Sequence, residues 1–154
     1  MSELMPNIEP KYSVDMAKNP IHVAVGVIFD NHQTDRILIA KRPQHLHQGG
    51  LWEFPGGKVT DSETVRQALE RELFEELAIS VIEAQPLMQI SHDYIDKQVF
   101  LDIWTVTLFS GEARGVEGQQ CQWVNLQEIL DVDSDYHFPE ANIAILEKLN
   151  ALKS

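Results

Sequence analysis

The sequence predicts a mixed α/β (α+β) fold, a β-sheet covered by helices, and three stretches carry this prediction. Residues Ile21–Phe29 are a run of apolar, mostly β-branched side chains, which is typical of a buried strand. Within Val65–Leu77, apolar residues recur at every fourth position and so predict one face of a helix. The segment Pro139–Leu152 predicts a second helix, with Pro139 in its first turn. Strands and helices mixed in this order favour a layered architecture.

Shorter elements complete this prediction. Further strands are expected at Ile37–Ala40, Val81–Ile90, Gln98–Phe109 and Cys121–Val124, and a helical turn at Leu126–Leu130. We expect the first of these to form a hairpin with Ile21–Phe29, and Pro55-Gly56-Gly57 to break regular structure. Thr60 and Glu63 have the spacing of a capping box before the first helix. In the last helix, Ile143, Leu146 and Leu149 are expected on one face.

Length and charge limit the function classes. The 154 residues suit one domain, expected at 21–154, preceded by a loose N-terminal arm at 1–20. The formal net charge of -12 argues against binding a nucleic-acid backbone, which requires a basic surface. No apolar run is long enough to span a membrane. The single cysteine, Cys121, cannot form an internal disulfide, so we expect a cytoplasmic protein with Cys121 as a small buried side chain.

Three carboxylates gather on the first predicted helix. Glu72, Glu75 and Glu76 occupy positions i, i+3 and i+4, which fall within about one third of the helix circumference. Like charges at this spacing destabilise an isolated helix, whereas a bound divalent cation would be stabilised by the carboxylate oxygens. The spacing alone also fits a solvated acidic face. The preceding glycine turn favours the metal site, because glycine lets the backbone approach a phosphate or metal closely.

The stretch Gly57–Ile79 resembles the Nudix box, G-x5-E-x7-R-E-U-x-E-E-x-G-U, where U is an aliphatic residue. The matching positions are Gly57, Glu63, Arg71, Glu72, Leu73, Glu75, Glu76 and Ile79. Ala78 stands where the pattern has Gly, so we expect an adjusted helix end and an intact metal site. The chain is also similar to MutT-type Nudix hydrolases from about Ile21 to the C-terminal helix, through its LWEFPGGK, EGQ and FPEAN segments.

This resemblance implies a Nudix fold and a Mg²⁺-dependent hydrolase (Mn²⁺ is an alternative) that converts a nucleoside triphosphate to monophosphate and pyrophosphate. It implies water attack at the β-phosphorus, 8-oxo-dGTP as substrate, and a role in nucleotide-pool sanitation and DNA repair. The implied metal ligands are Gly56 through its carbonyl, Glu72, Glu75, Glu76 and Glu117. Arg71 joins the four glutamates in the implied catalytic set and, with Glu63, holds the loop and helix in place. The implied nucleotide pocket consists of Arg42, Glu53, Phe54, Tyr94, Lys97 and Asn142.

Asn142 carries the most information on the base. A carboxamide presents a donor and an acceptor side by side and can bind a purine edge with both. In 8-oxoguanine N7 carries a hydrogen, so an acceptor at that place selects the oxidised base. Alternatively, Asn142 hydrogen-bonds its own backbone at a helix start.

Other functions stay open at this level. Within the family, a pyrimidine (CTP or dCTP) triphosphate pyrophosphohydrolase is the main alternative, and hydrolysis of ADP-ribose or NADH is less favoured. A non-catalytic module that binds oxidised guanine is disfavoured by the intact set of glutamates, and an acidic iron-binding protein by the glycine turn. The sequence leaves open whether the protein is a monomer or a dimer.

Overall fold

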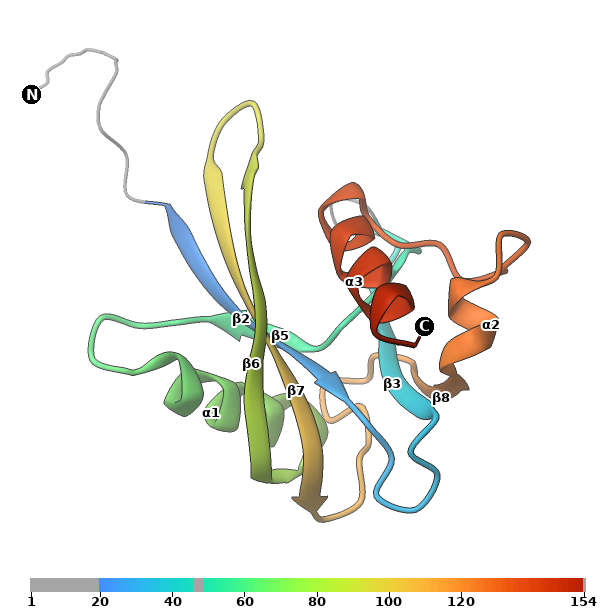
Figure 1. The fold of residues 1–154 in the computed structure, drawn as a ribbon. Helices are drawn as coiled ribbons and strands as arrows, with labels where there is room; N and C mark the ends of the chain where they lie inside the picture. The colour runs from blue at the N-terminus through green and yellow to red at the C-terminus, as the bar shows by residue number, and fades with distance from the viewer. Residues whose placement is uncertain (1–19, 46–48, 154) are drawn as a thin grey trace, which may run out of the picture.

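The computed structural model describes residues 20–45 and 49–153 and contains two β-sheets with helices packed around them (Figure 1). The predicted arm at 1–20 therefore lies outside the described residues, apart from Pro20. In chain order the elements are β2 (Ile21–Ile28), β3 (Arg36–Lys41), β4 (Trp52–Glu53), β5 (Gly56–Lys58), α1 (Val65–Leu77), β6 (Ser80–Asp93), β7 (Gln98–Ser110), β8 (Cys121–Asn125), α2 (Leu126–Leu130), the 3-10 helix η1 (Glu140–Asn142) and α3 (Ile143–Lys153). No helix in these ranges is long and apolar enough to cross a membrane.

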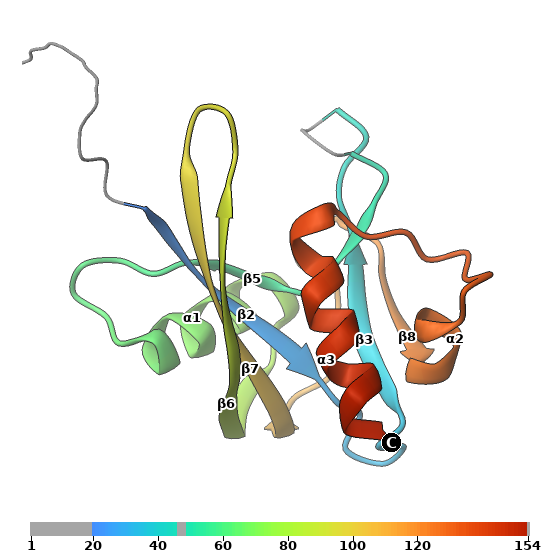
Figure 2. The same cartoon turned by 45° about the horizontal axis from the view of Figure 1, so that its top comes forward.

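The larger sheet has the strand order β5-β2-β7-β6, and the smaller sheet has the order β4-β3-β8. In the larger sheet β2 runs parallel to β7 and antiparallel to β5, while β6 and β7 form a long antiparallel hairpin. The tip of this hairpin projects beyond the rest of the sheet, and α1 and α3 lie on opposite sides of β2 and β7 (Figures 1 and 2). The predicted fold class, a mixed sheet between helices, is confirmed.

Strand β2 divides the interior into two apolar layers. Its residues Ala24 and Ile28 pack with α1, whereas Val25 and Val27 pack with β3, β8 and α3. Successive side chains of a strand point to opposite faces, which explains the unbroken apolar run of this segment. Gly26 faces α1, and a Cβ there would lie 3.3 Å from the Cδ1 atoms of two leucines of that helix. The missing side chain therefore lets α1 pack closely on the sheet.

Of two local predictions around β2, one was wrong and the other holds only in part. The expected hairpin with β3 is absent, since β2 and β3 lie in different sheets and are joined only by an isolated bridge between Phe29 and Ile37. The predicted break at Pro55-Gly56-Gly57 holds at Pro55, which lies between β4 and β5, but not at the two glycines, which form β5 and pair with Val25 and Ala24. A Cβ on Gly56 would overlap the carbonyl oxygen of Ala24. Here glycine permits close strand pairing where we expected a break.

The predicted start of α1 was also wrong, by four residues. Thr64 is the N-cap, and it forms a capping box with Gln67. Thr60 and Glu63 form a preceding turn, in which the amide of Thr60 donates to the Glu63 carboxylate at 3.0 Å. The helix stripe was predicted correctly, and it buries Leu69, Leu73 and Leu77 completely.

The C-terminal helix is shorter than predicted, and one of the three residues of its predicted apolar face lies outside the core. Pro139 is the N-cap of η1, and α3 begins only at Ile143. Ile143 is 43% exposed, whereas Ile145 is fully buried and Leu149 nearly so. Leu146 and Leu149 pack on the core as predicted, and Ile145 is buried in place of Ile143.

α1 ends in the left-handed conformation that its sequence disfavours. Ala78 is the C-cap with φ 62° and ψ 30°, and its amide donates to the carbonyl of Phe74. For an L-residue with a Cβ this conformation costs about 1 kcal/mol or more, whereas glycine adopts it freely. The expectation of a helix end tolerating Ala in place of Gly is met by this geometry.

We therefore predict that Ala78→Gly stabilises the protein by about 1 kcal/mol, because it removes the strain at the helix end. For a domain of this size this raises the melting temperature by roughly 2–4 °C, which thermal unfolding measures. Ala68→Gly, inside the same helix, is the control and lowers the melting temperature. A lower melting temperature for Ala78→Gly would contradict the assigned helix end.

Candidate active site

The carboxylate-bearing side of α1 is fixed by the buried stripe of the helix. Because Leu69 and Leu73 are fully buried against the sheet, the intervening Glu72 is held at the edge of the interface, beside β5. A Cβ on Gly57 would overlap the Glu72 carboxylate. The glycine of β5 thus leaves the space that this carboxylate occupies.

Arg71 joins the loop before α1 to the helix itself. Its guanidinium donates two hydrogen bonds to Glu63, at 2.6 and 3.0 Å, and one to the carbonyl of Lys58 at 2.9 Å. It also donates to Glu72 at 3.1 Å and to Glu75 at 3.3 Å. The planar guanidinium can bind several oxygens at once, which a lysine cannot. Arg71 is therefore placed to orient both the loop and two of the predicted metal ligands.

Glu76 lies where several negative charges meet. Its side chain is largely buried, and burial is the first cause that raises its pKa well above the ordinary value. A hydrogen bond with Glu72 and the charges of Glu72, Glu117 and Glu53 raise the pKa further. A carboxylate set of this kind disfavours its own ionisation and attracts a cation.

The side chains around Glu76 have the right donor atoms for a divalent cation. The carboxylates predicted as metal ligands offer only oxygen atoms, which Mg²⁺ and Mn²⁺ prefer. They belong to Glu72, Glu75, Glu76 and Glu117. Within the described residues no three His, Cys, Asp or Glu side chains lie close enough to form a ready-made coordination sphere. Glu72 and Glu75 are partly turned to Arg71 instead, and the side chain of Glu75 is 55% exposed.

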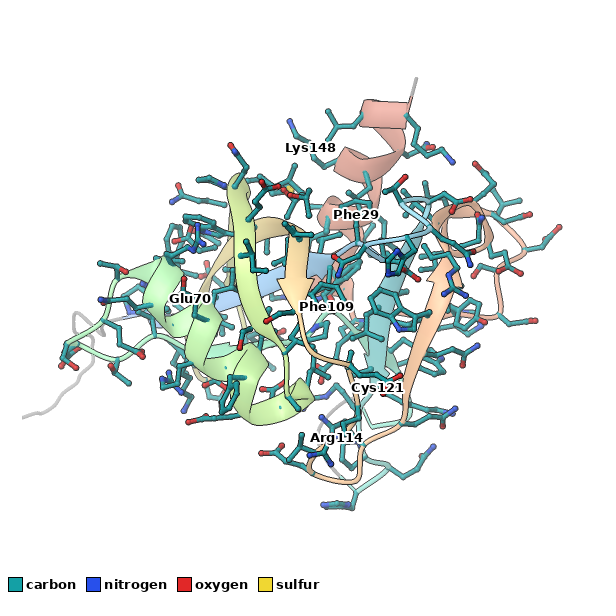
Figure 3. All side chains as sticks on the ribbon, turned by 90° about the horizontal axis from the view of Figure 1, so that it is seen from below. Phe29, Glu70, Phe109, Arg114, Cys121 and Lys148 are labelled. Atoms are coloured by element: carbon teal, nitrogen blue, oxygen red, sulfur yellow. The ribbon has the colours of Figure 1, made fainter. Side chains whose placement is uncertain are left out.

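Glu117 belongs to a loop that packs on the end of α1. The loop amides of Arg114 and Val116 donate to the carbonyls of Leu77 and Glu76, each at 3.0 Å. These are carbonyls of the last helical turn, which lack partners inside the helix. In Figure 3 Arg114 and Cys121 mark this segment beside the end of the helix. The loop therefore caps α1 and brings Glu117 to the cluster.

Two cavities meet beside this cluster. The larger, about 550 Å³, is lined by Lys41, Arg42, Gln44, Glu53, Gly56, Glu76, Glu117, Gln119 and Gln120, among others. The smaller, about 250 Å³, is lined by Val23, Val25, Arg42, Glu53, Phe54, Gly56, Tyr94, Val99, Leu101, Pro139, Ala141 and Asn142. Arg42, Glu53 and Gly56 line both, so a long ligand can occupy the two together. Most residues that line the larger cavity are polar or charged, whereas most residues that line the smaller are apolar, with Arg42, Glu53 and Asn142 adding polar groups to it.

The ion pair between Arg42 and Glu53 lies at the junction. Nη1 of Arg42 donates to Glu53 at 3.0 Å. Burial raises the pKa of Glu53, and the hydrogen bond and charge of Arg42 partly offset this effect. Strand alternation predicts that Glu53 points away from the core, and its neighbours Trp52 and Phe54 are indeed buried.

Most of the predicted site residues are brought together, and a few are not. Glu53, Gly56, Glu76 and Glu117 line the larger cavity, and Arg42, Phe54, Tyr94 and Asn142 line the smaller. Lys97 lines neither cavity. Its ammonium lies 5.6 Å from the ring centre of Tyr94. Neither cavity is lined by Glu72, Glu75 or Arg71, which are joined by ion pairs on α1. Sequence reasoning missed the contributions of Lys41, Gln44, Gln119 and Gln120.

Cys121 is only partly buried, where a buried side chain was predicted. It packs at the edge of the layer around α1. Burial, and then the charge of Glu76, raise the pKa of its thiol. A thiol that ionises less readily than usual is a poor nucleophile.

The NUDIX domain model matches residues 24–148, which is most of the chain. The chain belongs to the NUDIX domain family. It is 44% identical over 103 residues to an 8-oxo-dGTP diphosphatase of Proteus vulgaris, a match covering 67% of this chain and 90% of that protein. It is also 37% identical to a CTP pyrophosphohydrolase of Escherichia coli (strain K12), over 87% of this chain and 94% of that protein.

The solved structures agree with this assignment. A MutT structure from work on Aliivibrio salmonicida and Vibrio cholerae superposes with a TM-score of 0.75 and 40% identity, over 87% of this chain and 99% of that one. Members of the family that hydrolyse nucleotides generally need a divalent metal ion and act on small nucleotide substrates. This Nudix hydrolase thus has a carboxylate cluster next to a cavity of suitable size for a nucleotide.

The bonds between Arg71 and Glu63 generate a prediction on acid stability. Arg71 and the amide of Thr60 lower the pKa of Glu63 from 4.5 to about 2. Because the folded pKa is the lower one, the stabilisation is present above about pH 4.5 and is lost as the pH falls through about 2. Glu63→Gln therefore lowers the melting temperature at pH 7, and the difference from the wild type narrows toward pH 2.

Glu70→Gln is the matched control, since Glu70 forms an exposed pair with Arg66 on the same helix at 2.9 Å. Its melting temperature stays close to that of the wild type at every pH. An equal effect of the two variants, or a Glu63→Gln difference that widens in acid, would contradict the assigned role.

Proposed function

We propose that this Nudix hydrolase cleaves a nucleoside triphosphate to the monophosphate and pyrophosphate with Mg²⁺, and that 8-oxo-dGTP is its preferred substrate. The observation that carries the proposal is the junction of the two cavities. A slot lined by several apolar side chains and by the carboxamide of Asn142 opens, past Arg42 and Glu53, into a cavity bordered by Glu76 and Glu117. A base in the slot would leave its phosphates beside the glutamates.

The slot suits a flat ring. Phe54 lines the slot, and its ring stacks on that of Phe138 with ring centres 5.2 Å apart. Asn142 lines the same slot, and its carboxamide has no hydrogen-bond partner among the residues that the structure describes. The alternative in which Asn142 bonds its own backbone is thus not favoured by the geometry. Its donor and acceptor can therefore bind a base edge.

Charge decides where the phosphates go. The wall of the larger cavity holds Glu53, Glu76 and Glu117, which repel a triphosphate, against Lys41 and Arg42. A divalent cation held by Glu72, Glu75, Glu76, Glu117 and the carbonyl of Gly56 would neutralise the phosphates and lower the pKa of a bound water. Glu76 and Glu117 face the cavity, so a carboxylate oxygen of either residue can take the proton of the attacking water. Arg71 keeps Glu72 and Glu75 oriented.

Hydrolysis of CTP is the second candidate, because a relative named for it is 37% identical over most of the chain. The two activities differ in the base, so Asn142 is the residue that separates them. The proposal also places the reaction in the cytoplasm, as the substrate is a free nucleotide. The net charge of -12 favours a small metal-bound nucleotide over a nucleic acid as partner.

The substrate is tested by pyrophosphate release from 8-oxo-dGTP, dGTP, CTP and ADP-ribose with Mg²⁺. We expect the highest kcat/KM for 8-oxo-dGTP, and we expect Asn142→Ala to lose about tenfold or more of its preference over dGTP. If activity is highest on CTP, the proposed substrate is wrong and the proposed chemistry stands. If no nucleotide is hydrolysed, the proposed hydrolysis is wrong and a non-catalytic binding module is favoured.

The role of the carboxylates is tested by Glu76→Gln. We predict that kcat falls by at least about 100-fold while the fold is unchanged. The neutral amide of glutamine replaces a carboxylate that we expect to bind the metal ion and to accept a proton. Glu83→Gln, an exposed glutamate of β6, is the matched control and keeps full activity. Near-normal kcat in Glu76→Gln would refute the assigned site.

A further inference from the structure

We infer that Gln119 is a positioning residue, whose carboxamide fastens Glu117 to the end of α1 and so sets the place of Glu117 relative to Glu76. This inference rests on the proposed function for its catalytic meaning. Its structural content depends only on the loop and the helix.

Both ends of the carboxamide are used. Nε2 of Gln119 donates to the main-chain carbonyl of Glu76 at 3.1 Å, and Oε1 accepts from the main-chain amide of Glu117 at 2.9 Å. One side chain thus connects the backbones of two acidic residues that are far apart in sequence. Their carboxylates are close enough for the charge of Glu117 to raise the pKa of Glu76.

The loop needs such a connection. Glu117 itself is exposed, and Gly118 beside it adopts φ 84°. The turn is closed by a hydrogen bond that the amide of Gly118 donates to the carbonyl of Gly115. A Cβ on Gly115 would overlap the carbonyl oxygen of Gln119, so the turn is tight. Among the described residues, the other hydrogen bonds from this loop to α1 are donated by the amides of Arg114 and Val116, which precede Glu117. On the C-terminal side of Glu117, Gln119 provides the bond to the helix end.

The helix end also explains why an amide is suitable here. The carbonyl of Glu76 carries part of the negative end of the helix dipole. It accepts from Val116 and from Gln119 together. A glutamate at position 119 could accept from Glu117 but would bring another negative charge to the cluster, and an asparagine would be one methylene shorter. Glutamine has the required donor, acceptor and reach.

The direct test is amide hydrogen exchange at Glu117 in the nucleotide-free and metal-free protein, followed by NMR. Gln119→Ala removes the acceptor, and we expect the Glu117 amide to exchange at least about tenfold faster. Gln119→Met keeps the shape but not the hydrogen bonds, and should behave in the same way. Val116→Ala is the matched control, because it shortens an exposed side chain of this loop and keeps the main-chain donor.

Metal affinity gives a second readout. We expect titration with Mn²⁺ alone to show about tenfold or more weaker binding for Gln119→Ala and Gln119→Met, as is usual when a residue behind a metal ligand is lost. In a Glu117→Gln background, where the positioned carboxylate is gone, the Gln119 substitution should have no further effect on Mn²⁺ affinity or kcat.

The outcomes are distinguishable. Unchanged exchange at Glu117, or wild-type behaviour of Gln119→Met, would overturn the positioning role even if hydrolysis is found. An additional loss in the Glu117→Gln background would overturn it as well, in favour of a direct contact of Gln119 with the ligand. If no nucleotide is hydrolysed but Glu117 loses protection, the proposed function fails and the positioning role stands.

Discussion

The structure depends on how α1 packs against the larger sheet. Leu69, Leu73 and Leu77 are completely buried, and each contributes about 2 kcal/mol through burial of apolar surface. Gly26 of β2 allows the close approach. Because the packing fixes the rotation of the helix, it also decides that Glu72 and Glu76 lie at the edge next to β5. The position of the acidic cluster is thus a consequence of core packing.

The same arrangement has an electrostatic cost, which the protein meets with local bonds. Arg71 forms ion pairs with Glu63, Glu72 and Glu75, so part of the negative charge is compensated by the chain's own residues. Among the described residues Glu76 makes no ion pair with a basic side chain, and its pKa is raised by burial first and then by the neighbouring carboxylates. The compensated part supports the fold, and the uncompensated part faces the cavity. We expect a cation to bind where the charge is left over.

Features encoded by local periodicity could be predicted from the sequence. The stripe of α1 and the strand at Ile21–Ile28 follow from the repeat of apolar residues, and the acidic cluster follows from the spacing of Glu72 and Glu76. Features that depend on distant partners could not be predicted. Thr60 and Glu63 have the spacing of a cap, but Arg71 engages Glu63 from the next turns of the helix, and Thr64 caps α1 instead.

Sheet assembly and the loops show the same limit. The link from Gln119 to Glu76 joins residues 43 positions apart, and no pattern in the sequence marks it. The strand β5 forms because its glycines can approach β2, although glycine usually indicates a turn. Lys97 was predicted in the pocket and is found on the ring of Tyr94 at the hairpin.

The central claim, that the carboxylates on α1 and at Glu117 form a divalent metal site, is tested most directly by thermal unfolding with and without Mg²⁺. A ligand that binds only the folded state stabilises it by about 2.7 kcal/mol at one hundred times its Kd. We predict that Mg²⁺ raises the melting temperature of the wild type and of Glu83→Gln, and that Glu76→Gln loses most of this increase. An equal increase in all three proteins, or no increase in the wild type at millimolar Mg²⁺, would contradict the account.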